Sequence, residues 1–470
     1  MDEELVAEAD AREAWKRYPL ALGDDPELVF PQAEGDQGAE SNTYYVAGRL
    51  VGRESGHVRA FFAIFACNDV WHRVRADFHT LALFDLETGE YGTSTQFDFP
   101  RLLRRRRNHR LSVARGHLDV SFLGDAGESY WRTRRDASGA LEPFAYSLHA
   151  VGIDAAGQAM AVDLEIDSHK QPLPVGGKEY GGVKTCMGQY GTHSYFQSDL
   201  RFAGTLGWGG VREEVDGDCG WIDRQWAPRY LGVHTDLGNT RYRHEWREIH
   251  LENGIEMSVW THYDRRRTNR LIPFSGVTAA GPRGEIDSTT DFEIEPLSFV
   301  RDPGTVQPRR ALPGARYFTD RYRLRIRGWR VDLVSEPLVA TPAHLFPIEY
   351  WSGPTRLSGT LDGMAVSGFG FHERTLVWSR DFELVDVMRR TLRHLPAAAF
   401  ASAGTSGAAL ANSVWEIDGF LSHGDQQGAL RHLRTRVRPE LDRLEEPHRS
   451  HLQTIADDTA EALLRWWVRP

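Results

Sequence analysis

The segment YRLRIRGWRVDLV, residues 322–334, carries the pattern that decides the fold. Its apolar side chains Tyr322, Leu324 and Ile326 alternate with the arginines of residues 321–327. Successive side chains of an extended chain point to opposite faces, so a period of two predicts a β-strand with one buried and one solvated face.

Segments of the same character recur between about residues 43 and 378, at 57–66, 78–91, 117–131, 144–167, 241–264 and 355–371. The turn-forming stretches ENG, AGQ and LDG join such strands at hairpin spacing. No helical segments alternate with them, which argues against a parallel sheet. So many short antiparallel strands exceed one sandwich or barrel, and we predict an all-β protein built from two antiparallel β-barrels.

The two ends of the chain differ from this β region. The N-terminal part combines a short helical pattern, at Ala7, Ala11, Ala14 and Tyr18, with loop-like sequence, and we expect a surface lead-in. After residue 378, apolar residues return at helical spacing, and in segment 451–470 one helix face carries Leu452, Ile455, Leu463 and Trp467.

The predicted organisation has four parts. They are a lead-in at 1–40, a first barrel domain at 41–228, a second barrel domain at 229–378 and a helical extension at 379–470. We expect the helices to pack on the barrels or to join subunits of a homo-oligomer, because their mixed acidic charge argues against a membrane anchor.

Composition excludes several classes of protein. A net charge of -10 disfavours nucleic-acid binding, which needs a basic face. Cys67, Cys186 and Cys219 form no CxxC pair, so a reducing cytoplasm fits better than a disulfide framework. The acidic start MDEELVAEADAREAW lacks the features of a secretory signal. No apolar run approaches the ~18 residues that span a bilayer, which leaves only peripheral membrane contact open.

Two motifs that could bind a metal or cofactor fail on spacing. In RHEWREIH, residues 243–250, His244 and His250 lie six positions apart on one strand face, beyond shared-ligand distance at ~3.3 Å per residue. The glycines of GTLGWGG, residues 204–210, lack both the order and the following helix of a phosphate loop. No metal or cofactor is therefore predicted.

The candidate chemistry lies in two other short strands. His193 and Tyr195 share one face of GTHSYFQ, residues 191–197, and Trp221 and Asp223 share one face of GWIDRQW, residues 220–226. Both members of the second pair follow the first pair by 28 residues, which suits two strands that enter one cavity. Alternatively, Asp223 caps a turn or pairs with an arginine while the aromatic rings fill a core, and spacing leaves both interpretations open.

The order THSYFQSDLRFAGTL, a loop, then DGDCGWIDRQW resembles the lipocalin-like family of carotenoid 1,2-hydratases (hydroxyneurosporene synthases) and their relatives, which include fungal decalin-forming cyclases. The resemblance covers roughly residues 40–378, is specific across 187–226, and has weaker support from GFGFHERT. It implies two lipocalin-like barrels in tandem. It also implies catalytic positions at His193, Tyr195, Trp221 and Asp223, although Tyr195 and Trp221 exchange the tryptophan and tyrosine of the hydratase pattern.

These residues suggest acid chemistry on an apolar substrate. A carboxyl group between indoles loses hydration, which raises its pKa, so Asp223 could protonate an alkene. The rings of Trp221 and Tyr195 would stabilise the resulting cation, and His193 would position water or accept a proton. The remaining expected substrate contacts are Trp226, Tyr190 and Glu373.

Capture of the cation by water, by proton loss or by an internal nucleophile would give a hydratase, an isomerase or a cyclase. The favoured hypothesis is such an enzyme of specialised metabolism, acting on an isoprenoid or polyene. Two alternatives stay open. A Diels-Alderase-type cyclase would fold a polyene into a reactive shape without acid. A carrier would bind a lipid or isoprenoid unchanged.

Overall fold

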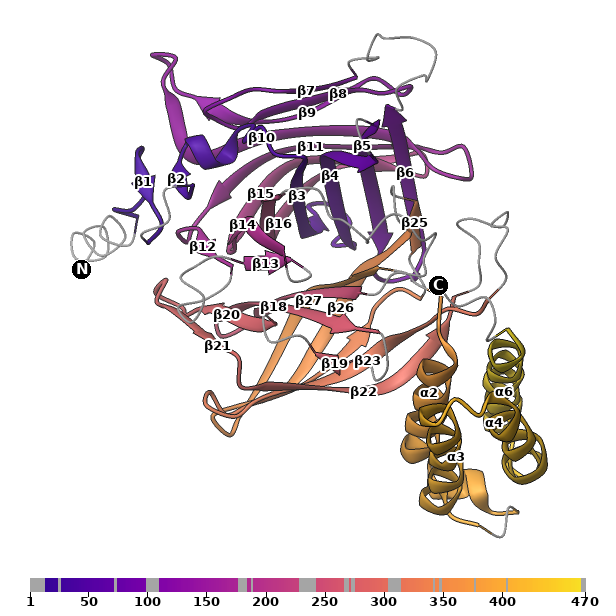
Figure 1. Cartoon of the computed structure of the whole chain (residues 1–470). Helices are drawn as coiled ribbons and strands as arrows, with labels where there is room; N and C mark the ends of the chain where they lie inside the picture. The colour runs from indigo at the N-terminus through magenta and orange to yellow at the C-terminus, as the bar shows by residue number, and fades with distance from the viewer. Residues whose placement is uncertain are drawn as a thin grey trace.

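The protein folds into two large antiparallel sheets followed by a helical extension, as a computed structural model shows (Figure 1). The structure describes residues 13–23, 27–71, 74–98, 110–175, 184–186, 189–227, 242–265, 270–271, 275–302, 314–340, 343–345, 349–375, 378–402 and 405–465. The predicted all-β architecture of two lipocalin-like antiparallel barrels with C-terminal helices is confirmed.

The first sheet has the strand order β6–β5–β4–β3–β16–β15–β11–β10–β9–β8–β7, and β14 pairs with β12, β13 and β16. The Ile153 N–H donates to Ser94 Oγ (3.1 Å) and so joins β10 to β6, which lie far apart in this order. The sheet therefore curls into a near-barrel. Its strands are β3 (Ser41–Gly52), β4 (Val58–Trp71), β5 (Val74–Asp85), β6 (Tyr91–Asp98), β7 (Leu111–Val113), β8 (Asp119–Leu123), β9 (Glu128–Arg135), β10 (Leu141–Ile153), β11 (Ala159–Ser168), β12 (Leu173–Pro174), β13 (Lys184–Cys186), β14 (Gln189–Gln197), β15 (Leu200–Trp208) and β16 (Val211–Ala227).

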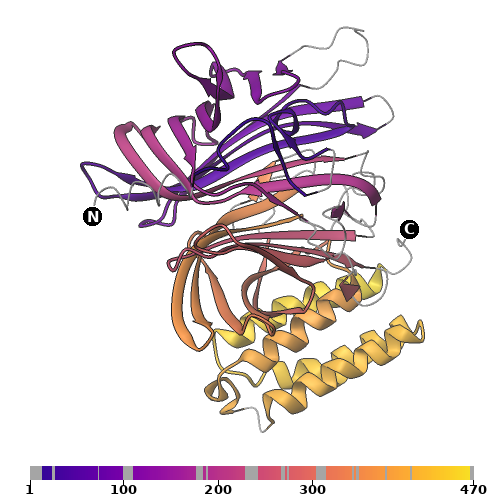
Figure 2. The ribbon, with the colours of Figure 1, turned by 90° about the vertical axis from the view of Figure 1, so that its left-hand side faces the viewer.

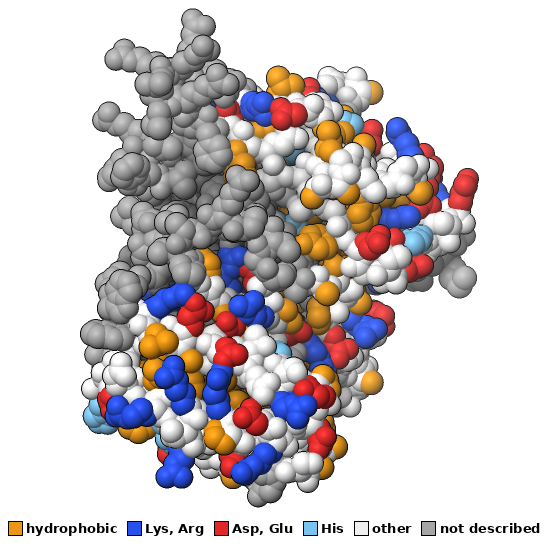
Figure 3. All heavy atoms as spheres, turned by 90° about the vertical axis from the view of Figure 1, so that its right-hand side faces the viewer, with side chains coloured by type: hydrophobic (Ala, Val, Ile, Leu, Met, Phe, Trp, Pro, Cys, Tyr) orange, Lys and Arg blue, Asp and Glu red, His pale blue; other side chains and the backbone are white. Residues whose placement is uncertain are grey.

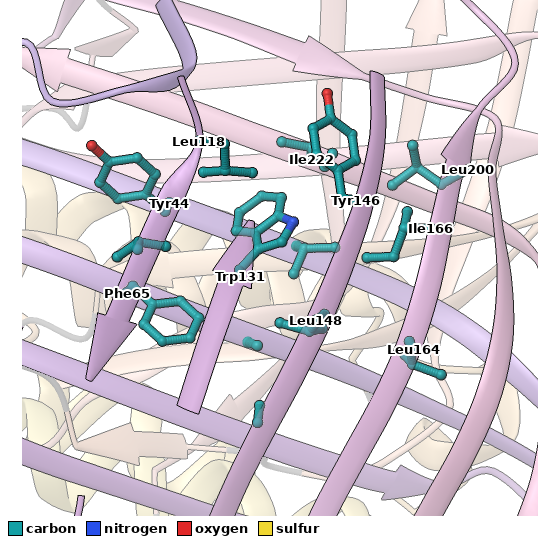
Figure 4. Close-up of a cluster of buried hydrophobic side chains, with 14 of the residues drawn as sticks. Tyr44, Phe65, Leu118, Trp131, Tyr146, Leu148, Leu164, Ile166, Leu200 and Ile222 are labelled. Carbon is teal, nitrogen blue, oxygen red and sulfur yellow. The ribbon is translucent and has the colours of Figure 1, made fainter. Parts of the chain in front are cut away.

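The interior of the first sheet is a packed apolar core. Trp131 and Tyr146 lie at its centre, with ring centroids 6.1 Å apart in an edge-to-face arrangement. Figure 4 shows Leu148, Leu164 and Ile166 beside them on neighbouring strands. The alternating apolar residues of these strands thus fill the barrel, as the period of two requires.

The N-terminal segment is part of this core, so the predicted surface lead-in is wrong for its described residues. Leu28, Phe30 and Ala33 are fully buried against the first sheet. Leu28 directly precedes β2 (Val29–Phe30), which pairs with β1 (Leu20–Ala21), and Ala33 lies in a 3-10 turn, η1 (Gln32–Glu34). The segment folds inward because these apolar side chains cover one end of the barrel. The helical pattern predicted at Ala7 and Ala11 lies outside the described residues.

The second sheet has the order β21–β20–β18–β17–β27–β26–β24–β23–β22, with β19 paired to β18 and β25 to β26. In segment 322–334, Tyr322, Leu324 and Ile326 are buried inside the second sheet. Arg323 lies on the outer face, where its Nη2 atom pairs with Asp332 Oδ2 (2.6 Å). Its strands are β17 (Tyr242–Leu251), β18 (Glu256–Asp264), β19 (Arg270–Leu271), β20 (Gly276–Ala280), β21 (Ile286–Thr289), β22 (Phe292–Arg301), β23 (Tyr317–Ile326), β24 (Val331–Pro337), β25 (Ala343–Leu345), β26 (Glu349–Leu361) and β27 (Met364–Thr375).

The two sheets pack on each other through a layer that we call the seam, made by side chains of β3, β4, β16, β17 and β27 that point away from the barrel interiors. Tyr45, Phe62 and Trp221 of the first sheet meet Phe369 and Phe371 of the second. The Trp221 and Phe371 rings lie 5.2 Å apart, edge to face. Figure 2 shows the two sheets stacked along this layer. Strand faces that would otherwise meet solvent are buried here.

The helical extension packs against the second sheet. The Tyr317 hydroxyl of β23 donates to Asp458 Oδ2 of α6 (2.7 Å), and Arg265, after β18, forms a two-point ion pair with Glu383 of α2 at 2.9 and 2.7 Å. Trp467 lies outside the described residues. The helical elements are α2 (Asp381–His394), η3 (Ala397–Phe400), α3 (Gly407–Ser422), α4 (Gln426–His432), η4 (Leu433–Val437), α5 (Arg438–Leu441) and α6 (His448–Leu464).

On the face shown in Figure 3, basic and acidic side chains are interspersed over the lower half of the molecule. The helices in the described ranges are all too short or too polar to cross a membrane. The strands of the two sheets span 41–227 and 242–375. The predicted domain limits at residues 228 and 378 remain a prediction.

Replacing Glu383 by glutamine should loosen the extension from the second sheet. The amide leaves the fully buried Arg265 guanidinium without its anion, a change that costs about 3–5 kcal/mol when a buried ion pair is broken. Hydrogen exchange, followed by mass spectrometry, should speed up in α2. Asp386→Asn, which breaks two partly exposed pairs within the same helix, should have an effect below about 0.5 kcal/mol. Equal protection in both variants would contradict this account.

Candidate functional site

The two motif strands are neighbours. β14 pairs with β16 in antiparallel register, so that His193 lies opposite Trp226, Tyr195 opposite Arg224 and Phe196 opposite Asp223. Residues of odd and even position on β16 point to opposite faces. The structure therefore divides the predicted site between the interior of the first sheet and the seam.

His193, Tyr195 and Trp226 lie on the interior side. The His193 and Trp226 rings stack at 5.5 Å with an interplanar angle of 16°, and Tyr195 meets Trp226 edge to face at 6.4 Å. Tyr195 also contacts Phe30 of the N-terminal segment at 4.7 Å. Next to them Arg224 Nη2 donates to the Gly35 carbonyl oxygen, Asn42 Oδ1 and Tyr44 Oη at 2.7, 2.8 and 3.0 Å.

This interior group includes a buried acid that the sequence analysis missed. Glu34 accepts hydrogen bonds from the hydroxyls of Tyr18 (2.9 Å) and Tyr146 (2.7 Å). Burial raises the pKa of Glu34 to about 7, although these hydrogen bonds act in the opposite direction. The bonds tie the N-terminal segment to β10, and we assign Glu34 a structural role.

Asp223 lies on the seam side, where a second group of acids meets it. Ser194 Oγ donates to Asp223 Oδ1 at 3.4 Å. From the second sheet, Glu373 accepts hydrogen bonds from Tyr350 Oη (2.7 Å) and Ser352 Oγ (3.4 Å). Glu248 accepts one from Trp246 Nε1 (3.2 Å). We call Asp223, Glu248 and Glu373 the carboxyl cluster.

Burial and mutual repulsion hold protons on this cluster. Burial raises the pKa of Glu248 well above its usual 4.5, and the charges of Glu373 and Asp223 raise it further. Burial also raises the pKa of Glu373 to about 7, where Asp223 adds to the rise and the Tyr350 and Tyr45 hydroxyls oppose it. Like charges that share a dry site cannot all ionise, so the cluster stores a proton near neutral pH.

One carboxyl oxygen of the cluster, Glu248 Oε2, is available to a bound molecule. Glu248 is 3 % exposed, and its Oε2 atom has no hydrogen-bond partner among the described residues. Trp246 Nε1 donates to the other oxygen of Glu248, Phe371 lies opposite Glu248 on β27, and Trp221 packs on Phe371. A protonated Glu248 could therefore donate to a bound molecule rather than to the protein.

The expectation that two indoles flank Asp223 is wrong. Trp221 shares its face, but Trp226 lies three positions away and points into the first barrel. The expectation that His193 and Tyr195 join Asp223 in one cavity is also wrong, because their side chains and that of Asp223 point to opposite faces of the sheet. The structure brings Asp223 and Trp221 together with Glu373, predicted only as a substrate contact. The side chain of Tyr190, near the start of β14, lies outside the described part of the chain.

Sequence reasoning also missed Glu248. Its signal was present in RHEWREIH, where Trp246, Glu248 and His250 fall at period two, an acid between aromatic rings on one strand face. That pattern was considered only for metal binding. Within the described ranges, no group of three His, Cys, Asp or Glu side chains has a geometry that could hold a metal ion.

A half-open pocket of about 490 Å³ lies between the two sheets. Its walls come from both sheets and include Arg49, Asp218, His250, Glu256 and Phe369. Phe369 also packs near Trp221, with ring centroids 6.4 Å apart, so one wall of the pocket adjoins the aromatic side chains of the seam.

Two antiparallel, barrel-like sheets packed along a seam define a lipocalin-like fold. The AttH-like family model matches residues 21–375, and the chain belongs to this family. The family predicted from the two motif strands is thereby confirmed.

Two solved structures share the fold. An AttH of Nitrosomonas europaea has a TM-score of 0.56 at 17% identity, covering 75% of this chain and 99% of that one. Kievitone hydratase of Nectria haematococca has a TM-score of 0.51 at 14% identity, covering 76% of this chain and 96% of that one. At these identities the likeness concerns the fold. No curated protein matches the chain in sequence.

Glu34 gives the folded protein a pH dependence that can be measured. Its pKa is raised in the folded state, so its contribution to stability is fully present below about pH 4.5 and is lost as the pH rises towards about 7. The size of this loss is about 3 kcal/mol, from ~1.4 kcal/mol per pKa unit. Glu34→Gln should flatten this slope in thermal unfolding between pH 4.5 and 7. Exposed Glu54→Gln should leave the slope unchanged. A wild-type slope in the Glu34 variant would contradict the assignment.

Proposed function

We propose that this protein is an enzyme that adds a proton to an unsaturated carbon of a hydrophobic substrate, with the carboxyl cluster as the proton source. The observation that carries the proposal is Glu248 Oε2, a buried oxygen that has no hydrogen-bond partner in the described part of the chain. It belongs to a carboxyl group whose pKa is raised by burial and by two neighbouring acids. An alkene is a weak base, and it needs an acid that is both protonated and held in a dry site.

The roles within the cluster differ. Asp223 supplies the negative charge that keeps a proton on Glu248 or Glu373. Glu248 donates this proton from Oε2 to the substrate carbon, the π-bond electrons form the new C–H bond, and a carbocation remains. The Tyr350 and Ser352 hydroxyls stabilise Glu373 when it ionises. The aromatic rings of Trp221 and Phe371 line one side of the space around the cation and exclude water from that side.

The fate of the cation decides the class of reaction. If water adds, its oxygen forms the new C–O bond and its surplus proton returns to the Glu248 carboxylate, which restores the enzyme. Loss of a different proton gives an isomerase, and attack by an internal double bond gives a cyclase. Hydration is the outcome that we favour, because one protein of the same fold is a hydratase.

In this proposal three of the predicted site residues act indirectly: His193, Tyr195 and Trp226. They pack β14 onto β16 from the interior of the first sheet and so fix the strand that carries Asp223. They are positioning residues. A Diels-Alderase-type cyclase or a carrier would need none of the acids. Substitutions in the carboxyl cluster therefore distinguish these two alternatives from the proposed enzyme.

Glu248→Gln should remove proton transfer while it keeps the shape of the side chain. The measurement is deuterium incorporation, by mass spectrometry, into a panel of isoprenoids and polyenes incubated with the full chain in heavy water. A general acid contributes about 10²–10⁴-fold, so we expect a loss of that order. Glu336→Gln, on the outer face of the second sheet, is the matched control and should keep full incorporation. Unchanged incorporation in the Glu248 variant would refute the acid role.

The rate should depend on pH in a defined direction. The reactive form is protonated Glu248, so activity is highest below its raised pKa and falls as the pH rises through that pKa. Asp223→Asn removes the charge that raises the pKa of both glutamates, so the alkaline limb should move to lower pH. Ser147→Ala, on the outer side of β10, should leave the limb in place. A limb unmoved by Asp223→Asn would contradict the assigned role.

A further inference from the structure

The interior of the second sheet carries a group of arginines in an otherwise enclosed space. β27 places Glu373 in the seam and its neighbour Arg374 inside the sheet, because successive residues of a strand face opposite ways. Arg243 and Arg247 of β17 lie near Arg374, and beyond them the interior is apolar, lined by Ile249, Leu324 and Leu333.

Arg374 is a buried cation without an ion pair. Its side chain is 1 % exposed, and among the described residues no carboxylate lies within 4.0 Å of it. Nη2 lies 2.5 Å from Nδ1 and 3.0 Å from Nε2 of the His372 ring, but the N–H groups of Nε and Nη1 have no acceptor among the described residues. Buried charges in proteins are paired, because an isolated ion loses its hydration without compensation.

The nearby acids are already engaged. Glu245 forms ion pairs with Arg247 and with Arg243, the latter at 3.4 Å. Asp320 accepts a hydrogen bond from Ser298 Oγ at 2.7 Å. Burial lowers the pKa of Arg374 to about 9, with Arg247 adding to this effect and Glu245 opposing it. The guanidinium still carries its charge at neutral pH.

Two aromatic rings flank the guanidinium of Arg374. The centroids of the Trp351 and Phe318 rings lie 4.3 and 5.0 Å from the guanidinium carbon. Trp351 lies opposite Arg374 in the β26–β27 register, is itself buried, and its Nε1–H has no acceptor among the described residues. Three buried nitrogen atoms of one cross-strand pair, Nε and Nη1 of Arg374 and Nε1 of Trp351, thus lack an acceptor in the described part of the chain, and a ligand with two acceptor oxygens would match them.

We propose that Arg374 and Trp351 form a binding site for a small carboxylate inside the second sheet. A carboxylate is flat, carries the single charge needed to balance Arg374, and presents two acceptor oxygens to the edge of the guanidinium. The site lies on the opposite face of β27 from Glu373. It is therefore independent of the proton chemistry in the seam, and either proposal can fail alone.

The test is equilibrium dialysis of the full chain against radiolabelled acetate at constant ionic strength. We expect saturable binding near one acetate per chain. Arg374→Met should weaken it at least tenfold, and Trp351→Phe, which keeps the ring but removes the N–H, should weaken it several-fold. Arg323→Met is the control, because Arg323 lies on the outer face in an ion pair with Asp332 and should bind acetate like the wild type.

Arg374→Lys guards against a folding defect, because it keeps the charge and should retain weaker, saturable binding. Circular dichroism checks that each variant folds, and deuterium incorporation by Arg374→Met should equal that of the wild type. Absence of saturable acetate binding to the wild type, equal binding to Arg374→Met, or binding of chloride in place of acetate would each overturn the carboxylate site.

Discussion

The exclusion of water from the seam is the constraint on which the rest of the structure depends. In a single barrel the outward side chains of β16, β17 and β27 would face solvent, and carboxyl groups there would be ordinary anions. Because the two sheets cover each other, Glu248 and Glu373 are buried in a layer with Trp221 and Phe371, and half-buried Asp223 lies beside them. Burial is the largest cause of the raised pKa of both glutamates.

Strand alternation sorts the charges of the second sheet. On β17, Arg247 faces the interior and Glu248 the seam, and on β27, Arg374 faces the interior and Glu373 the seam. Glu248 and Glu373 therefore lie one backbone layer away from Arg247 and Arg374, whereas Glu245, on the interior face of β17, pairs with Arg247. This separation keeps the two seam glutamates from pairing with these guanidinium groups, and burial raises the pKa of both glutamates.

The fold could be predicted from the sequence because alternation is local. Tyr322, Leu324 and Ile326 are buried as their spacing predicts, and helical spacing after residue 378 marks the extension correctly. The family resemblance identified the strand that carries Asp223. The alternation of side chains along a strand could also have shown that Asp223 and Trp226 point to opposite faces. The interpretation that two indoles flank Asp223 overlooked this alternation.

The remainder of the site depends on contacts that no local pattern contains. Glu248 and Glu373 meet Asp223 only when the second sheet docks on the first, and Glu34 reaches Tyr146 only when the N-terminal segment folds into the barrel. The acids of the seam come from both halves of the chain, one from the first sheet and two from the second. Under the proposed function, separating the two halves would hydrate Glu248 and Glu373 and return their pKa values towards the ordinary range. The proposed acid therefore depends on the assembly of both sheets and belongs to neither half alone.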